Sequence, residues 1–230
     1  MSHALKHIAF VLDGNRRWAC QRGMPILLGH KNGYGLVKNI TPLLSKYGIE
    51  YVSYYVFSME NWKRSEEEVN YLMEIFRDFF AICDYATEHN IRVKAIGNLE
   101  KLPMDLQEQI RYVEDFTKDN TSLTVIAAIS YGGRDEIVRA AKKIMQSIIG
   151  KKMDLDDLNE ETFASYLDTN GLPYPDAFVR TSEKRTSNFL IWQAAYSEIF
   201  FIDKLWPDFD EDDLANIVSE FSQRERRYGR

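Results

Sequence analysis

Residues 7–18 read HIAFVLDGNRRW, and their character changes abruptly at Asp13. Residues 8–12 form a continuous apolar run, which is typical of a strand buried on both faces of a parallel sheet. Polar and charged residues then follow without a spacer. Ligands of open α/β sheets bind just beyond the carboxyl ends of the strands, so this stretch predicts a ligand site immediately after a central strand.

The residue types after this strand indicate the chemistry of the site. Asp13 has the position of a metal ligand or an acid/base group, and Gly14 permits a tight turn and a close approach to a ligand. We expect Asn15 to cap the next helix, whose N-terminal amides favour an anion, beside the positive charges of Arg16 and Arg17. Together these residues predict Mg²⁺ plus phosphate. The alternative is a strand, a turn and a solvated helix start.

The rest of the chain alternates between strand-like and helical patterns. Apolar or β-branched runs at 8–12, 51–57, 91–96, 123–129, 177–179 and 199–202 are separated by helical segments. This alternation predicts an α/β fold with a mostly parallel sheet of about six strands and helices on both faces. Without a long flexible linker or a repeat, residues 1–230 are expected to form a single domain.

Composition narrows the function classes. The chain has 230 residues, 45% of them hydrophobic, and a net charge of −6, which argues against nonspecific nucleic-acid binding. Its two cysteines, Cys20 and Cys83, have neither metal-ligand nor disulfide spacing and predict reduced thiols. With no signal-peptide core and no run of about 20 apolar residues, we expect a cytoplasmic protein.

A second polar cluster follows the strand at 51–57. It reads Ser58-Met59-Glu60-Asn61-Trp62-Lys63-Arg64. Ser65 is expected to cap the next helix, with Glu68 completing a capping box. The helix predicted from residue 66 to about 88 has an apolar arc of roughly 200°, wider than an ordinary core-facing stripe. Such a helix is either deeply buried or lines an apolar cavity.

Further clusters follow later strands. Ser130-Tyr131-Gly132-Gly133-Arg134 comes after the strand at 123–129, and a basic segment at 180–189 follows the strand at 177–179. In that segment Arg180, Arg185 and Ser187 could jointly hold a diphosphate. His30 is expected to open a helix beside the anion site, either as a ligand contact or as a structural residue.

The motifs DGNRRW, FSMENWKR, SYGGR and the segment from Arg180 to Ser187, in this order, resemble those of the cis-prenyltransferases, the undecaprenyl diphosphate synthase family. The resemblance covers nearly the whole chain. It implies a homodimeric, Mg²⁺-dependent enzyme that repeatedly adds isopentenyl diphosphate to an allylic diphosphate, such as farnesyl diphosphate, with a cis double bond formed at each addition. It also implies an apolar product tunnel beside the helix at 66–88, and the lipid product could bring the protein to a membrane.

The resemblance implies roles for particular residues. Asp13 and Glu198 would be metal ligands, and Asp13 and Asn61 catalytic residues, although a neutral amide is a poor base and Asn61 could instead orient the substrate. Gly14 to Arg17 and His30 would hold the allylic diphosphate, and Arg64, Arg180, Arg185 and Ser187 the isopentenyl diphosphate. The remaining expected substrate-binding residues are Trp18, Ser58, Met59, Glu60, Trp62 and Thr186. The basic tail at 224–229 would help to complete the site, either within one chain or across a dimer interface.

This chain departs from the family pattern in several places. Ile26 stands where family members commonly carry an arginine that contacts the allylic diphosphate, and Arg16 stands where they often have glycine. Ser182-Glu183 replaces a Gly-Gly pair, and the interval from Arg180 to Arg185 is one residue short. We therefore expect Arg16 to have taken over part of the diphosphate contact. The competing class is a non-catalytic partner subunit on the same fold, whose mark would be loss of the catalytic clusters.

Overall fold

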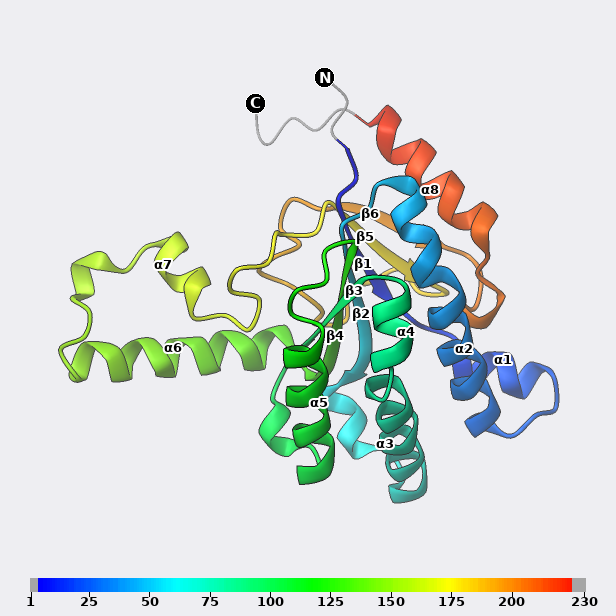
Figure 1. The fold of residues 1–230 in the computed structure, drawn as a ribbon, viewed down its shortest axis with the longest axis horizontal. Coiled ribbons are helices and arrows are strands. Elements are labelled where there is room, and N and C mark those ends of the chain that lie inside the picture. Colours follow the sequence, from blue (N-terminus) through cyan, green and yellow to red (C-terminus); the bar gives the residue numbers. More distant parts are fainter. Residues whose placement is uncertain (1–3, 225–230) are drawn as a thin grey trace.

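The fold is a six-stranded, entirely parallel sheet, seen in a computed structural model that describes residues 4–224 (Figure 1). The strand order is β3-β4-β2-β1-β5-β6. The strands are β1 (His7–Val11), β2 (Tyr51–Ser58), β3 (Ile91–Ile96), β4 (Leu123–Tyr131), β5 (Ala177–Thr181) and β6 (Glu198–Ile202). The predicted sheet is confirmed, and each strand lies within two residues of its predicted bounds.

Helices cover one face of this sheet. The α-helices are α1 (Asn15–Gln21), α2 (Ile26–Leu44), α3 (Glu66–Phe80), α4 (Cys83–Glu88), α5 (Met104–Phe116), α6 (Gly133–Ile149), α7 (Glu160–Ser165) and α8 (Glu211–Gln223). Apolar side chains of α2, α3, α4, α5 and α8 form the larger core cluster against alternate residues of the strands. Across residues 4–224, no helix combines the length and the apolar character that a membrane span requires.

The opposite face is packed differently from the prediction. There, Ala9 and Val11 of β1 and Phe178 of β5 pack against Phe189 and Leu190, which belong to the irregular segment between β5 and β6. We predicted helices on both faces, but at this place a loop covers the sheet. The same loop carries Arg185 and Ser187, so this packing fixes a predicted binding segment to the strands.

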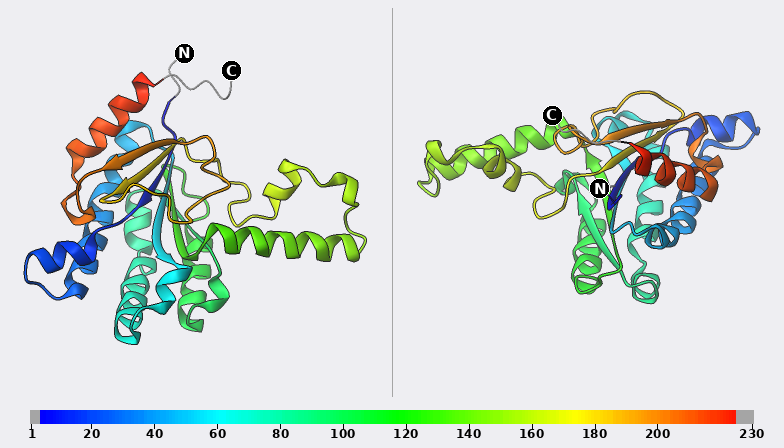
Figure 2. Two further views of the ribbon diagram at one scale, coloured as in Figure 1. Left: turned by 180° about the vertical axis from the view of Figure 1, so that it is seen from behind. Right: turned by 90° about the horizontal axis from the view of Figure 1, so that it is seen from above.

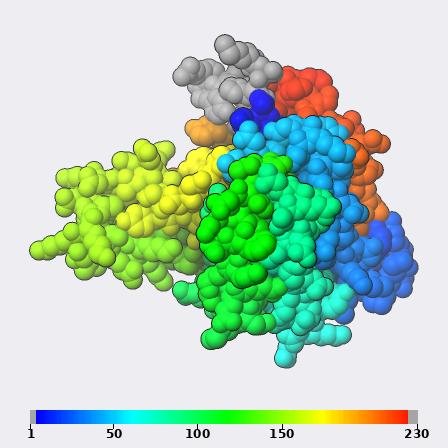
Figure 3. Space-filling view, viewed as in Figure 1, coloured from blue at the N-terminus to red at the C-terminus, as the bar shows by residue number. Residues whose placement is uncertain are grey.

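Helices α6 and α7 form an arm that projects from the sheet (Figures 1 and 2), and the arm is a clear protrusion in the space-filling view (Figure 3). Arg139 of α6 pairs with Asp168 beyond α7 and ties the arm together. Glu136 is buried near its base, where it accepts hydrogen bonds from Tyr131, Gln193 and the backbone of Asp168. Burial raises the pKa of Glu136.

Two helices differ from their predicted bounds. Helix α2 begins at Ile26 and not after His30, because Pro25 provides a fixed φ of −56° at the N-cap. His30 therefore lies inside the helix. The helix predicted at 66–88 is broken between α3 and α4, although the break contains neither proline nor glycine. The change of direction lets Tyr85 bond to the Lys38 carbonyl and buries Ala86 against the sheet.

Candidate active site

The candidate site lies where the strand order reverses. From β1 the chain runs to its neighbour β2, whereas from β5, on the other side of β1, it runs outward to β6. Ligands of open α/β sheets bind in the crevice at such a switch point. Thr181 closes this junction, because its hydroxyl donates to the Asp13 carbonyl (2.8 Å) and accepts from the Asp13 amide (3.1 Å).

Asp13 and Arg180 meet at the carboxyl ends of β1 and β5. The Arg180 Nη2 atom donates to Asp13 Oδ2 at 2.7 Å, and Asp13 Oδ1 accepts from the Gly14 amide at 2.8 Å. Arg180 is only 3% exposed and also donates to the Arg185 carbonyl and to Ser187 Oγ. A buried guanidinium with three directed hydrogen bonds is a rigid cation, so its position is fixed before any ligand arrives.

The turn after β1 brings α1 close to α2. Gly14 has φ of 110°, which a residue with a side chain rarely adopts, and it is the N-cap of α1. The prediction that Asn15 caps this helix is wrong, because Asn15 is its first residue and its side chain donates to the Leu12 carbonyl. A Cβ on Gly33 would lie 2.2 Å from Asn15 Oδ1, so glycine at 33 permits this close approach.

Glu68 gathers three basic side chains on the other side of the site. Its Oε1 accepts from His30 Nε2 at 3.0 Å and from Arg64 Nη1 at 3.1 Å, while Arg16 Nη1 lies 3.8 Å from Oε2. Ser65 caps α3 as predicted, by accepting from the Glu68 amide. The Glu68 carboxylate, however, does not complete a capping box and serves the basic cluster instead.

The environment of His30 determines what its ring can do. Burial lowers the pKa of His30, and the nearby charges of Arg64 and Arg16 lower it further, against the raising effect of Glu68. In the neutral ring, Nε2 must carry the proton that it donates to the Glu68 carboxylate, so Nδ1 is an acceptor. His30 therefore orients Glu68, and in this state it has no N–H to offer a phosphate.

A third carboxylate, Glu183, pairs with two arginines that we predicted to bind phosphate, Arg17 and Arg185. Glu183 Oε1 lies 2.9 Å from Arg17 Nη2, and Oε2 accepts from Arg185 Nη1 at 2.6 Å. Ser182 also accepts from Arg17 at 2.6 Å, with φ of 63°, in a region that favours glycine. The two residues that replace the family's Gly-Gly pair thus hold Arg17. An incoming diphosphate would have to compete with Glu183 for both arginines.

The segment after β2 folds as a short 3₁₀ helix, Met59–Lys63. Asn61 Oδ1 accepts from the Ser58 amide at 3.1 Å, so the amino group of Asn61 is the end left to face a substrate oxygen. Trp62 packs edge-on against Phe57 and donates to Ser130 Oγ at 3.0 Å. Through these contacts Trp62 anchors the 3₁₀ helix to β2 and β4.

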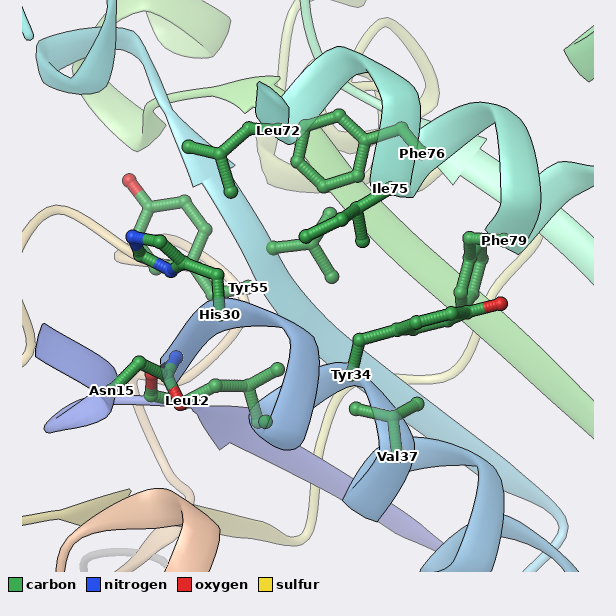
Figure 4. Close-up of a pocket in the computed structure, with 12 residues that line it drawn as sticks. Leu12, Asn15, His30, Tyr34, Val37, Tyr55, Leu72, Ile75, Phe76 and Phe79 are labelled. Carbon is green, nitrogen blue, oxygen red and sulfur yellow. Dashed lines mark hydrogen bonds between the residues drawn. The ribbon is translucent and has the colours of Figure 1, made fainter. Parts of the chain in front are cut away.

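These groups surround a polar cleft of about 530 Å³. Its lining consists of Val11, Leu12, Asp13, Asn15, His30, Tyr55, Val56, Ser58, Glu60, Asn61, Arg64, Leu72, Arg134, Arg180, Ser187 and Asn188. An apolar cavity of about 70 Å³ adjoins the cleft between α2 and α3 (Figure 4). Leu12, Asn15, His30, Tyr55, Val56 and Leu72 line both spaces, so these residues form the mouth of the cavity.

Several predicted site residues do not line the cleft. These are Gly14, Arg16, Arg17, Trp18, Met59, Trp62, Arg185 and Thr186. Trp18 donates to Asp208 at 2.6 Å and stacks with Arg22, which fixes it against the segment before α8. Arg185 is 61% exposed and Thr186 is also exposed.

Glu198 lies at the amino ends of the strands, whereas Asp13 lies at their carboxyl ends. It is the first residue of β6 and is level with Ala177, the first residue of β5, whereas Asp13 follows the end of β1. At about 3.3 Å per residue the two carboxylates are separated by roughly 20 Å. Glu198 pairs instead with Arg224 at 2.8 Å. One chain therefore does not bring the two predicted metal ligands together, and the rest of the basic tail lies outside the described residues.

The residues of the cleft fit a magnesium ion that is shared with a substrate. Within residues 4–224, no group of three or more His, Cys, Asp or Glu side chains is arranged to hold a metal. Mg²⁺ commonly binds through one or two carboxylates together with substrate phosphates, and needs no protein cage. Asp13 is the carboxylate at the switch point, and its side chain is 32% exposed. Asp13 thus fits the ion only when phosphate oxygens complete its shell.

Sequence reasoning missed four residues of the site. Glu68 was taken for a capping residue, and Tyr55 for an ordinary strand residue. Arg134 was noted within SYGGR without a role, yet its side chain lines the cleft and has no ion-pair partner among residues 4–224. Asn188 accepts from the Arg134 amide and donates to Glu60. The positions of Arg134 and Asn188 after strand ends were the available signal.

Comparison with known proteins identifies the family. The Prenyltransf family model, which describes undecaprenyl diphosphate synthases, matches residues 11–229. The chain belongs to the undecaprenyl diphosphate synthase family. An isoprenyl transferase from Treponema denticola is 46% identical and is matched over 100% of this chain and 99% of its own. A ditrans,polycis-undecaprenyl-diphosphate synthase from Micrococcus luteus, named as specific for (2E,6E)-farnesyl diphosphate, is 44% identical over 97% of this chain and 91% of its own.

A solved structure supports membership of the undecaprenyl diphosphate synthase family. Lavandulyl diphosphate synthase from Lavandula x intermedia, in complex with dimethylallyl diphosphate, has a TM-score of 0.95 and 36% identity, with 99% of both chains covered. The predicted family resemblance is confirmed, and the chain is thereby placed among the prenyl transferases.

Proposed function

We propose that this protein is a Mg²⁺-dependent cis-prenyltransferase that extends farnesyl diphosphate with isopentenyl diphosphate to a long polyprenyl diphosphate. Two unlike spaces meet in the molecule: a polar cleft rich in arginine opens into an apolar cavity between α2 and α3. A prenyl diphosphate has the same division into an anionic head and an apolar tail. The Micrococcus luteus relative, named for farnesyl diphosphate, supports the choice of primer.

The junction suggests how the two substrates would lie. With the allylic tail in the apolar cavity, its diphosphate would lie at the mouth, near Asp13, Asn15 and the His30–Glu68 pair. The second diphosphate would then lie farther out, near Arg180, Ser187 and Arg134, where guanidinium groups favour forked contacts with phosphate oxygens. Holding the two reactants at neighbouring sites makes the reaction effectively unimolecular.

The reaction requires a leaving group, a nucleophile and a proton acceptor. The allylic C–O bond breaks and its electron pair leaves with the diphosphate; the isopentenyl double bond attacks the allylic carbon; and a proton then leaves to form the new double bond. Mg²⁺ held by Asp13 would supply the positive charge that stabilises the departing diphosphate. Asn61 offers an amino group and is a poor base, so it would orient a diphosphate oxygen that accepts the proton.

The alternative of a non-catalytic partner subunit is not supported. Asp13, Asn61 and Arg180 line the cleft, and Arg185 and Glu198 are also present. The relatives are named as transferases and synthases.

We also propose a homodimer that contacts a membrane peripherally during product release. The edge strand β6 carries Ile199 and Phe201, which are 41% and 38% exposed, and Tyr196 before it is 69% exposed. An edge strand with exposed apolar side chains favours association with another chain. A dimer could also bring Glu198 of one copy toward the site of the other, which one chain does not achieve. Light scattering on the purified protein tests this: a mass of one chain would exclude the dimer.

Incorporation of radiolabelled isopentenyl diphosphate tests the function directly. The purified protein is incubated with farnesyl diphosphate and MgCl₂, and the extracted lipid is analysed by mass spectrometry. We expect a polyprenyl diphosphate ladder in steps of one isoprene unit, and no incorporation when EDTA replaces MgCl₂. Absence of incorporation at saturating substrates and Mg²⁺ would refute the proposal.

A further inference from the structure

The inner end of the apolar cavity is closed by two aromatic rings. Tyr34 extends from α2 across the space between the helices to Phe79 of α3, at the end of the cavity away from His30 and Asn15 (Figure 4). The two rings are 6.1 Å apart and meet edge to face at 60°. Such a contact is stabilising beyond the area that it buries, so the pair is a defined partition and not a loose surface contact.

A second, smaller cavity lies behind this partition. It measures about 20 Å³ and is lined by Tyr34, Val37 and Phe79, which also line the first cavity, together with Ile82, Ile91 and Val125. The polar cleft, the first cavity and the second cavity thus follow one another between α2, α3 and the sheet. Tyr34 and Phe79 are the aromatic side chains that separate the second space from the first.

The hydroxyl of Tyr34 is not what holds the ring in place. Its oxygen is buried and has no hydrogen-bond partner among the described residues, a condition that normally costs stability. Burial correspondingly raises the pKa of Tyr34. The ring is held instead by Phe79 on one side and by the Lys38 ammonium group, 4.8 Å from the ring centre. The position therefore uses the bulk of the ring and not its polar group.

We propose that Tyr34, packed against Phe79, is the residue that sets the length of the prenyl product. This inference rests on the proposed function. Each addition inserts a new unit at the diphosphate end, so the distal end of the chain is pushed inward from the cleft. A space of about 70 Å³ is smaller than the roughly 150 Å³ cavity that accommodates benzene, so a growing chain must displace side chains. At the inner end, the Tyr34 ring is the first obstacle in its path.

Removing the ring should join the two cavities. In the incorporation assay we expect Tyr34→Ala to shift the product distribution upward by at least one isoprene unit. Tyr34→Phe keeps the bulk and loses only the unpaired hydroxyl, so its distribution should match the wild type and its melting temperature should be equal or higher. Tyr34→Leu is a milder variant that tests the same point if Tyr34→Ala does not fold. An unchanged or shorter distribution from a folded Tyr34→Ala or Tyr34→Leu protein would overturn the proposal.

A binding measurement separates failure of this inference from failure of the proposed function. Calorimetry compares the affinities of farnesyl and geranylgeranyl diphosphate, which differ by one isoprene unit. We expect the extra unit to improve binding at least fivefold more in Tyr34→Ala than in the wild type. If the wild type shows no incorporation but this difference in binding appears, the result supports Tyr34 as the limit of the chain-binding space and refutes the proposed catalytic function. Equal effects of the extra unit in both proteins would refute the partition.

Discussion

Asp13 and Arg180 hold each other across the junction of β1 and β5, with Arg180 Nη2 2.7 Å from Asp13 Oδ2. Arg180 is buried and donates to Ser187 with its other terminal nitrogen, so a single guanidinium links the strand ends to the binding loop. This contact places a carboxylate and a cation at the point where both diphosphates would meet.

Arg180→Lys tests whether the fork geometry is needed as well as the charge. Lysine keeps the charge but cannot bond to Asp13 and Ser187 in two fixed directions. Loss of one charge-assisted hydrogen bond, worth about 1.5–3 kcal/mol, should lower kcat/KM by roughly 10- to 100-fold. Arg111→Lys, an exposed position on α5, is the control for a surface change. Equal kcat/KM values for Arg180→Lys and the wild type would show that a point charge suffices.

Glu68→Gln tests the carboxylate that gathers His30, Arg64 and Arg16. The variant leaves Arg64 partly buried without its counter-charge, so we expect about 2–4 kcal/mol of lost stability and a higher KM for the allylic diphosphate. Glu67→Gln is the matched control, because Glu67 is exposed on the same helix. Urea denaturation and steady-state kinetics measure both effects. If the two variants are equally stable and equally active, Glu68 is only a helix residue.

Arg16 and Ile26 offer a test of compensation. Arg16 reaches the Glu68 cluster, with 3.8 Å between Arg16 Nη1 and Glu68 Oε2, while Ile26 is the first residue of α2. Arg16→Gly should raise the KM for farnesyl diphosphate, and Ile26→Arg should restore much of the loss in the double variant. The Michaelis constant is measured for all four combinations. Purely additive effects would mean that the two positions do not share a diphosphate contact.

His7 should make stability depend on pH. Burial lowers the pKa of His7 to about 4, and its ring bonds to Ser53 and to the Pro173 carbonyl. Between pH 6.5 and 4, His7 is protonated in the unfolded protein and stays neutral in the folded protein. The free energy of unfolding therefore falls as the pH falls. The shift corresponds to about 3 kcal/mol over this window. Urea melts at several pH values give the free energy of unfolding, which should fall more steeply with falling pH in the wild type than in His7→Gln over this window. An equal dependence on pH in both proteins would contradict this role.

The sheet was predictable because local patterns determine it. Each strand of a buried parallel sheet reads as an apolar run, and the polar clusters after the runs at 8–12, 51–57 and 177–179 indicated where the site would be. Side-chain partnerships were not predictable in this way. Glu68 satisfies every local requirement of a capping box, yet its carboxylate is drawn to His30 and Arg64 because α2 packs beside α3. That packing is a tertiary property.

The position of Glu198 in the fold was also not predictable from its sequence motif. A motif match gives a position along the chain, whereas the register of β6 against β5 determines at which end of the strands Glu198 lies. The break between α3 and α4 was also invisible, because no proline or glycine marks it. In both cases the deciding interaction joins residues that are distant in the sequence.

We infer that Asp13, at the carboxyl end of β1, provides the carboxylate on which prenyl transfer depends. Its most direct test is the turnover of Asp13→Ala, measured as incorporation of radiolabelled isopentenyl diphosphate into farnesyl diphosphate over a titration of MgCl₂. Circular dichroism melting confirms that the variant is folded. We predict turnover lower by at least a hundredfold at every Mg²⁺ concentration. Near-normal turnover in saturating Mg²⁺ would show that prenyl transfer does not depend on the Asp13 carboxylate.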